Sequence, residues 1–198
     1  MKNSLTSPHL QHETFRLYPP VTGIPKYTAQ TPQPLTISSR KHLIPPHTMV
    51  IPQVLALHTH PAHWTPDPLE WRPSRWISPH SPREHDRQPT TKLDHETLKE
   101  PQRGTFLPWS DGAHVCPGRK FSQVKFVAVM AALFRTHRVR PVLRAGETEA
   151  RARERVRGVV EDSAVRMTLQ MKDPGRVRVR WVLKEGVGRM SGGSNDPC

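Results

Sequence analysis

The sequence predicts a mainly α-helical fold with small β-sheets, of the α+β class, with many irregular loops. One long amphipathic helix pattern occupies residues 117–137, and apolar and polar residues alternate over 165–183, as is typical of β-strands. The chain also contains 22 prolines in 198 residues. That proline content excludes a helical bundle, because proline breaks helices and favours irregular connections.

The first half of the chain predicts short elements between loops. Residues 9–18 are expected to form a helix, which the two following prolines end. Residues 19–34 predict a proline-rich loop. Residues 61–104 are rich in proline, histidine and charged residues, so we expect irregular structure there.

Two short strands are expected between these loops, at Leu35–Ile37 and Thr48–Ile51. The connection between them contains turn-forming residues at 38–40 and at Pro45 and Pro46. The sequence therefore predicts a small β-region in the first half of the chain.

The second half contains the strongest periodic patterns. The predicted helix 117–137 has one apolar stripe, and residues 144–160 are rich in arginine and expected to be exposed. The alternation over 165–171 resumes over 177–183 after a turn, which predicts a hairpin. The stripe consists of Phe121, Val124, Ala128, Ala131 and Phe134.

Composition and charge limit the functional classes. The net charge is +13 and 34% of the residues are hydrophobic. A basic chain attracts nucleic acid, acidic lipid or acidic protein, although a solvated basic surface explains the charge equally well. The low apolar content is unusual for a self-sufficient domain, so we expect the chain to be part of a larger fold.

Neither the cysteines nor the apolar runs indicate a secreted or membrane-spanning chain. Cys116 is internal and Cys198 is the last residue, so no disulfide framework is expected. No apolar run approaches the roughly 20 residues that span a bilayer, and residues 1–7 are polar rather than a signal peptide. Cys116 is therefore inert, reactive or a metal ligand.

The segment from Phe106 to Gly118 carries the chemistry. It is a turn-rich loop that leads into Cys116, and the predicted long helix follows directly. Free amides at a helix N-terminus favour a thiolate placed there. Gly112 and Gly118 leave room for a flat cofactor near the backbone, and Trp109 offers an aromatic wall. A single soft thiolate suits a haem iron.

This segment resembles the cysteine-ligand loop of the cytochrome P-450 family. Its pattern of an aromatic residue, glycine, cysteine and glycine falls on Trp109, Gly112, Cys116 and Gly118. The resemblance implies that Cys116 is the axial ligand of the iron in haem (iron protoporphyrin IX). His114 stands where an arginine usually pairs with a haem propionate, so that contact is expected to be weaker or pH-dependent.

A second motif supports the same resemblance. Glu13 and Arg16 share one helix face at spacing i, i+3, as in the E-x-x-R pair of the family. An aromatic-x-Pro-x-Arg-aromatic loop over 71–76 then places Arg75 to complete a buried triad, as the resemblance implies. Breaking such a buried set typically costs about 3–5 kcal/mol.

The resemblance covers residues 9–183 and is closest in character to fungal microsomal members of the family. It implies a partial haem-binding domain over 1–185, from the carboxy-terminal part of the P-450 fold, followed by a disordered tail over 186–198. The implied activity is a monooxygenase that inserts one oxygen atom from O₂ into a hydrophobic organic substrate. The implied partner is an NADPH-dependent flavoprotein reductase. Such enzymes are usually found at the endoplasmic reticulum membrane, although this chain shows no anchor.

Other interpretations remain open. In the family the oxygen-activating helix lies upstream of Glu13, so no catalytic residue is assigned here and the chain could be a truncated, inactive fragment. A basic non-enzymatic binding module is the alternative, but the arginines at 151–157 lack interleaved aromatic residues, so nucleic-acid binding is not expected. His58, His60 and His63 are interpreted as loop histidines rather than metal ligands.

Overall fold

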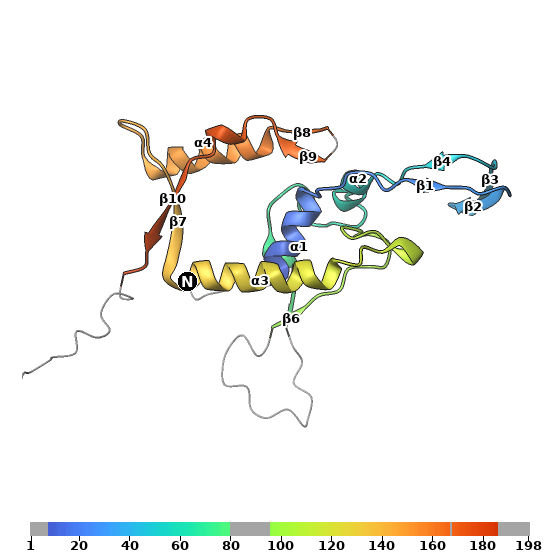
Figure 1. Ribbon diagram of the computed structural model, residues 1–198, viewed down its shortest axis with the longest axis horizontal. Helices are drawn as coiled ribbons and strands as arrows, with labels where there is room; N and C mark the ends of the chain where they lie inside the picture. The colour runs from blue at the N-terminus through green and yellow to red at the C-terminus, as the bar shows by residue number, and fades with distance from the viewer. Residues whose placement is uncertain (1–7, 80–95, 167, 186–198) are drawn as a thin grey trace, which may run out of the picture. The chain divides into compact units, whose positions relative to one another are not determined.

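The computed structural model describes residues 8–79, 96–166 and 168–185, and the chain forms two compact units (Figure 1). Among the described residues, the first unit comprises 8–119 and 165–169, and the second comprises 120–164 and 170–185. The tail predicted to be disordered, 186–198, lies outside the described residues.

The first unit is built on α1 (Pro8–Leu17), which confirms the first predicted helix. Its buried face is polar rather than apolar and includes Gln11, Glu13 and Arg16. The chain leaves the helix at two prolines, after the Tyr18 N–H donates to the Thr14 carbonyl at 2.7 Å. A fully buried polar helix face must find its partners elsewhere in the unit.

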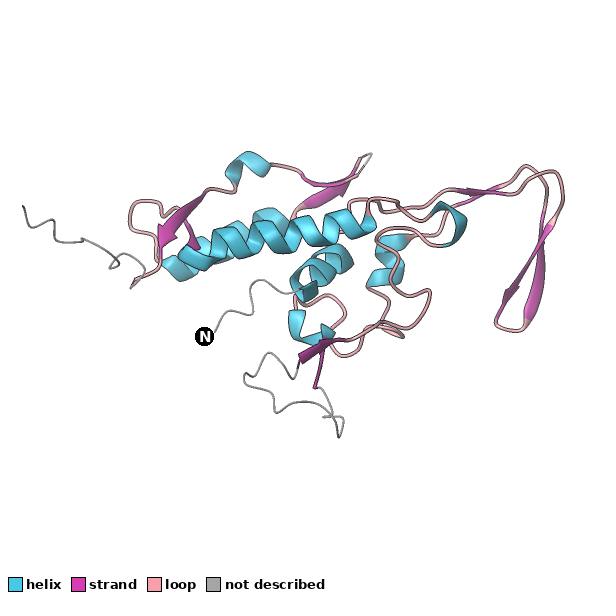
Figure 2. Cartoon of the chain, turned by 60° about the horizontal axis from the view of Figure 1, so that its bottom comes forward, coloured by secondary structure: helices cyan, strands magenta, loops and turns pink. Residues whose placement is uncertain are grey.

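Two small antiparallel sheets follow (Figure 2). Strand β2 (Gln33–Ile37) turns directly into β3 (Arg40–Ile44) through two serines with positive φ angles of 47° and 69°. Strand β1 (Lys26–Tyr27) pairs with β4 (Met49–Val50). The expected strands near 35–37 and 48–51 exist, but they do not pair with each other. Strand β2 pairs with β3, and β4 pairs with β1.

The rest of the first unit is mostly irregular where it is described; residues 80–95 of the predicted irregular region 61–104 lie outside the described residues. It contains α2 (Val54–His58), the 3₁₀ helix η2 (Pro73–Trp76), strands β5 (Ile77–Pro79) and β6 (Glu96–Leu98), and the 3₁₀ helix η4 (Gly112–His114). Both α2 and η2 pack against α1. This packing brings the end of α2 and the arginine-bearing turn to the polar face of α1.

The second unit contains α3 (Arg119–Thr136) from its second residue onward, and this helix confirms the predicted long helix. None of its residues is buried: Phe121 is 69% exposed and Val124 is 58% exposed. The predicted apolar stripe is therefore present on the helix but is not part of a core among the described residues. No helix among these residues is both long and apolar enough to cross a membrane.

The predicted hairpin of 165–171 with 177–183 is wrong. Strand β10 (Val179–Leu183) pairs instead with β7 (His137–Pro141), and Trp181 lies opposite Val139. The first half of the predicted hairpin contributes to a separate sheet, in which β8 (Ser163–Val165) pairs with β9 (Leu169–Met171). The 3₁₀ helix η5 (Pro174–Arg176) separates β9 from β10. Alternation shows which face of a strand is apolar, but it does not identify the partner strand.

The arginine-rich segment, which was expected to be exposed, forms a helix that was not predicted, α4 (Glu149–Glu161). Thr148 caps its first turn, and Ala152 and Val159, one heptad apart, are buried. Arg155 makes two hydrogen bonds of 2.8 Å to the Glu147 carboxylate. These bonds lower the pKa of Glu147 to about 2.

Candidate functional site

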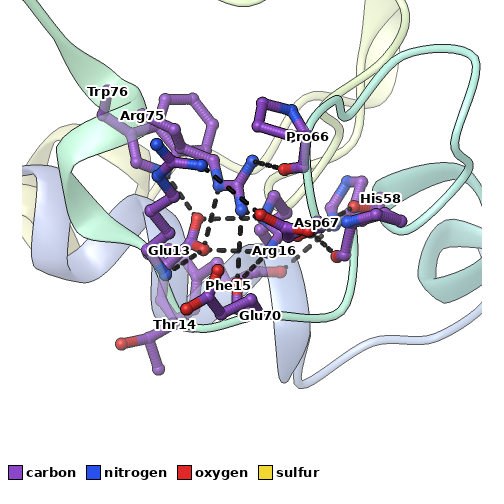
Figure 3. Close-up of polar contacts among 12 residues, drawn as sticks. Glu13, Thr14, Phe15, Arg16, His58, Pro66, Asp67, Glu70, Arg75 and Trp76 are labelled. Atoms are coloured by element: carbon purple, nitrogen blue, oxygen red, sulfur yellow. Dashed lines mark hydrogen bonds and ion pairs between the residues drawn. The ribbon is translucent and has the colours of Figure 1, made fainter.

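The carboxylate of Glu13 is the centre of the polar network in the first unit (Figure 3). It is fully buried and accepts five hydrogen bonds from two segments of the chain, α1 and residues 72–76. The donors are Arg16 Nε at 2.9 Å and Nη2 at 2.8 Å, the Arg72 backbone N–H at 2.8 Å, Arg75 Nε at 3.1 Å and Trp76 Nε1 at 2.8 Å. All the hydrogen-bonding capacity of a buried carboxylate is thereby used.

Arg16 is also fully buried and has partners on all three nitrogens of its guanidinium. Besides its two bonds to Glu13, it donates to the carbonyls of His58 at 3.1 Å, Pro68 and Glu70 at 3.0 Å. A planar guanidinium can bridge a carboxylate and several carbonyls at once, which an ammonium group cannot do. Arg16 therefore connects α1 to the end of α2 and to the following loop.

Arg75 binds the same carboxylate from η2. Its other nitrogens donate to the carbonyls of Pro66 at 3.2 Å, Asp67 at 3.0 Å and Glu70 at 3.3 Å. The structure thus brings Glu13, Arg16 and Arg75 together, and both guanidinium groups also hold the loop over residues 66–70 (Figure 3).

Two opposing effects act on the Glu13 carboxyl. Burial raises the pKa of Glu13, but the hydrogen bonds from Arg16, the Arg72 N–H and Trp76 outweigh it, so the pKa lies below its ordinary value. The group therefore remains ionised and paired. Removing one member of such a set leaves an uncompensated buried charge.

His58 joins this network to the cysteine loop, residues 106–118, which contains Cys116. It is fully buried; its Nδ1 lies 3.1 Å from the Phe15 carbonyl, and its Nε2 accepts the Leu107 N–H at 2.8 Å. These two partners require a neutral ring that is protonated on Nδ1. Burial, only partly opposed by the Phe15 hydrogen bond, lowers the pKa of His58 to about 4.

An aromatic cluster lies around the same ring. Phe106 has its ring centroid 4.9 Å from His58, 4.8 Å from Trp76 and 5.4 Å from His12. Trp109 meets Phe106 edge-on at 6.4 Å and is only 8% exposed. The beginning of the cysteine loop is therefore anchored by two aromatic rings and by one backbone hydrogen bond.

The cysteine loop closes on itself before α3. The Cys116 N–H donates to the Trp109 carbonyl at 2.8 Å, and η4 lies inside this closure. Gly112 has a φ of 78°, which a residue with a side chain rarely adopts. The Arg119 guanidinium lies over the Trp109 ring at 5.4 Å. The loop is thus closed by its own backbone and covered on one side by a cation.

Cys116 itself is exposed and borders a pocket of about 320 Å³. Such a volume lies within the range of ligand pockets, and its lining is largely apolar. A side chain at Gly112 would meet no neighbour within 4 Å, and one at Gly118 would approach the Cys116 sulfur to 3.7 Å. The pocket is lined by Val21, Ile24, Pro25, Lys26, Leu107, Pro108, Trp109, Ser110, His114 and Cys116.

These residues fit a flat apolar cofactor with an iron to ligate. The sulfur is accessible, the backbone at Gly112 is open, and His114 lies at the pocket as an exposed polar group. The Ser110 hydroxyl is buried without a hydrogen-bond partner in the described part of the chain. In that same part, no cluster of three or more histidine, cysteine or acidic side chains could hold a free metal ion.

The structure corrects the interpretation of His58 as a loop histidine. His58 is the last residue of α2 and is fully buried, as is Val54 one turn earlier. Two buried residues at spacing i, i+4 were the available signal, but five residues are too few to show helical periodicity. The roles of Phe106 and of the Trp76 donor were not predicted, because they depend on contacts between distant segments.

Comparisons with known proteins point to one family. The profile described as Cytochrome P450 matches residues 9–156. A cytochrome P-450 monooxygenase of Arthrobotrys oligospora is 30% identical, over 85% of this chain and 30% of its own length. A monooxygenase of the phomenoic acid biosynthesis cluster of Leptosphaeria maculans is 34% identical, over 69% of this chain and 24% of its own length. The chain thus spans about a quarter to a third of these relatives.

Solved structures share the fold. The haem domain of cytochrome P450DA superposes with a TM-score of 0.57 at 16% identity, over 89% of this chain and 30% of that domain. A retinoic acid-bound cyanobacterial CYP120A1 gives a TM-score of 0.57 at 19% identity, over 89% of this chain and 32% of the other. These likenesses confirm the predicted fold class.

Replacing Glu13 by Gln should strongly destabilise the first unit. The variant leaves two guanidinium groups near a neutral amide, so we expect the free energy of unfolding to fall by about 3–5 kcal/mol. Urea unfolding followed by the fluorescence of the buried Trp64 and Trp76 measures this loss. The matched control is Glu149→Gln on α4, which removes solvent-accessible ion pairs with Arg140 and Arg153, and little change is expected. Equal midpoints for the two variants would contradict this view of Glu13.

The stability of the chain should depend on His58 between about pH 6.5 and pH 4. In that range the unfolded chain binds a proton that the folded ring excludes, so stability is full above the unfolded pKa of 6.5 and decreases as the pH falls. The decrease attributable to His58 amounts to as much as about 3 kcal/mol. It is measured as the difference between the wild type and His58→Gln in urea unfolding at several pH values. Parallel pH profiles for the two proteins would rule out a neutral, buried His58.

Proposed function

The chain belongs to the cytochrome P-450 family, and we propose that Cys116 is the residue through which it ligates the iron of the family's haem cofactor. The exposed sulfur beside an apolar pocket is the observation that supports this assignment. Cys116 is the one cysteine among the described residues, and soft thiolate is an established axial ligand of haem iron.

The neighbouring residues would hold the cofactor in different ways. Gly112 and Gly118 keep the backbone clear of side chains beside the sulfur. Trp109 is fixed by Phe106 and Arg119, so it presents a rigid surface to the pocket. His114, an exposed polar side chain at the pocket, would contact a haem propionate.

The proposed reaction is the monooxygenation of an organic substrate. One oxygen atom of O₂ enters a C–H bond and the other leaves as water. The step consumes two protons and two electrons, and a flavoprotein reductase delivers the electrons from NADPH. Bound haem supplies the activation of O₂, which the electron-donating thiolate favours. The substrate is expected to be hydrophobic. The basic charge of the chain suits an acidic protein partner better than a nucleic acid, because the arginine-rich α4 carries no aromatic residues.

The described residues include the proposed haem ligand, and we assign no catalytic acid to them. We expect the isolated 198-residue chain to bind haem but not to hydroxylate a substrate. Efficient monooxygenation needs a site that excludes water, whereas Cys116 and the apolar side chains Phe121 and Val124 of α3 are exposed in this chain.

A haem titration tests the ligand assignment. Ferric haem is added to the purified chain, which is then reduced under carbon monoxide, and we expect the strongly red-shifted Soret band of a thiolate complex. Cys116→Ser should abolish this band because its hydroxyl is a far weaker ligand for iron. Cys198→Ser is the control and should retain it.

Two results would overturn the proposal. One is a red-shifted band that persists in Cys116→Ser, and the other is a wild-type chain that folds without binding haem. Steep, salt-dependent DNA binding by that haem-free chain would instead favour a basic binding module.

A further inference from the structure

We propose that His58 is a positioning residue. Its hydrogen bonds connect the buried Glu13 network to the cysteine loop and so hold the loop in the conformation that iron ligation needs. The inference rests on the proposed function of Cys116 only in its last step. Its first step, that His58 holds the loop, stands on the contacts of the protein alone.

His58 contacts both sides of this connection. Its backbone carbonyl accepts from Arg16 Nη1 at 3.1 Å, and its Nδ1 binds the Phe15 carbonyl of α1. Its Nε2 accepts the N–H of Leu107, the second residue of the loop that leads to Cys116. Backbone and side chain of one residue therefore join α1, α2 and the loop.

The geometry requires one tautomer of the ring. The Phe15 carbonyl can only accept and the Leu107 N–H can only donate, so Nδ1 carries the proton and Nε2 does not. The charged group that faces His58 from α1 is Arg16, and the loop side contributes Phe106 and Leu107, neither of which titrates. A second proton on the ring would face the Leu107 N–H and displace it.

Matched variants can separate the two sides of the ring. Asparagine and glutamine carry the same amide group on side chains of different length. The shorter side chain of His58→Asn can reach only the position of Nδ1, whereas that of His58→Gln can place an oxygen near Nε2 and accept the Leu107 N–H. His58→Leu keeps an apolar side chain but makes neither bond. Both amide variants are polar and uncharged, so a difference between them reports on the hydrogen bond from the Leu107 N–H to the side chain of residue 58.

The first measurement is amide hydrogen exchange at Leu107 in the haem-free full chain. We expect about tenfold faster exchange in His58→Asn and His58→Leu than in the wild type, because one buried hydrogen bond is lost. His58→Gln should restore most of the protection. Equal exchange rates at Leu107 in the wild type, His58→Asn and His58→Leu would overturn the inference.

The second measurement is the carbon monoxide spectrum of the haem-loaded chains across pH 5–8. We expect the fraction of the red-shifted thiolate band to fall at least about threefold in His58→Asn and to recover in His58→Gln, since a loosened loop holds the sulfur less well. Equal fractions in the two amide variants would overturn the link to iron ligation. Loss of the band in the wild type, with Leu107 still protected, would overturn the assignment of Cys116 instead.

Discussion

The buried carboxylate of Glu13 is the constraint on which the first unit depends. A charge with no access to water must be fully hydrogen-bonded, and here five donors from α1, the Arg72 backbone and η2 converge on it. Because the donors include two arginines that also bind loop carbonyls, one carboxylate with two ion pairs organises a region that otherwise has little regular structure. This explains how a segment so rich in proline can hold a defined shape.

The same constraint extends to the cysteine loop through His58 and Phe106. Arg16 fixes the end of α2, His58 accepts the Leu107 N–H, and the Phe106 ring packs against both His58 and Trp76. The Cys116 sulfur can therefore remain exposed at a pocket while the start of its loop is held from the interior. This buried support suits the proposed ligation of a cofactor by Cys116.

Motifs of fixed spacing were the features best predicted from the sequence. Glu13 and Arg16 share one turn of helix and the cysteine loop is contiguous, so local order alone indicated where these residues lie. The long helix α3 was also recognisable from its period. The partner of β10 and the burial of His58 were not, because both depend on contacts between segments far apart in the chain. The helix α4 was missed since its arginines conceal the two buried positions, Ala152 and Val159.

The most direct test of this account is iron K-edge X-ray absorption on the haem-loaded full chain, which identifies the atoms bonded to the metal. We predict one sulfur atom in the first coordination shell of the wild-type iron and none in Cys116→Ser. A wild-type first shell made only of nitrogen and oxygen would contradict the assignment of this loop as the haem ligand.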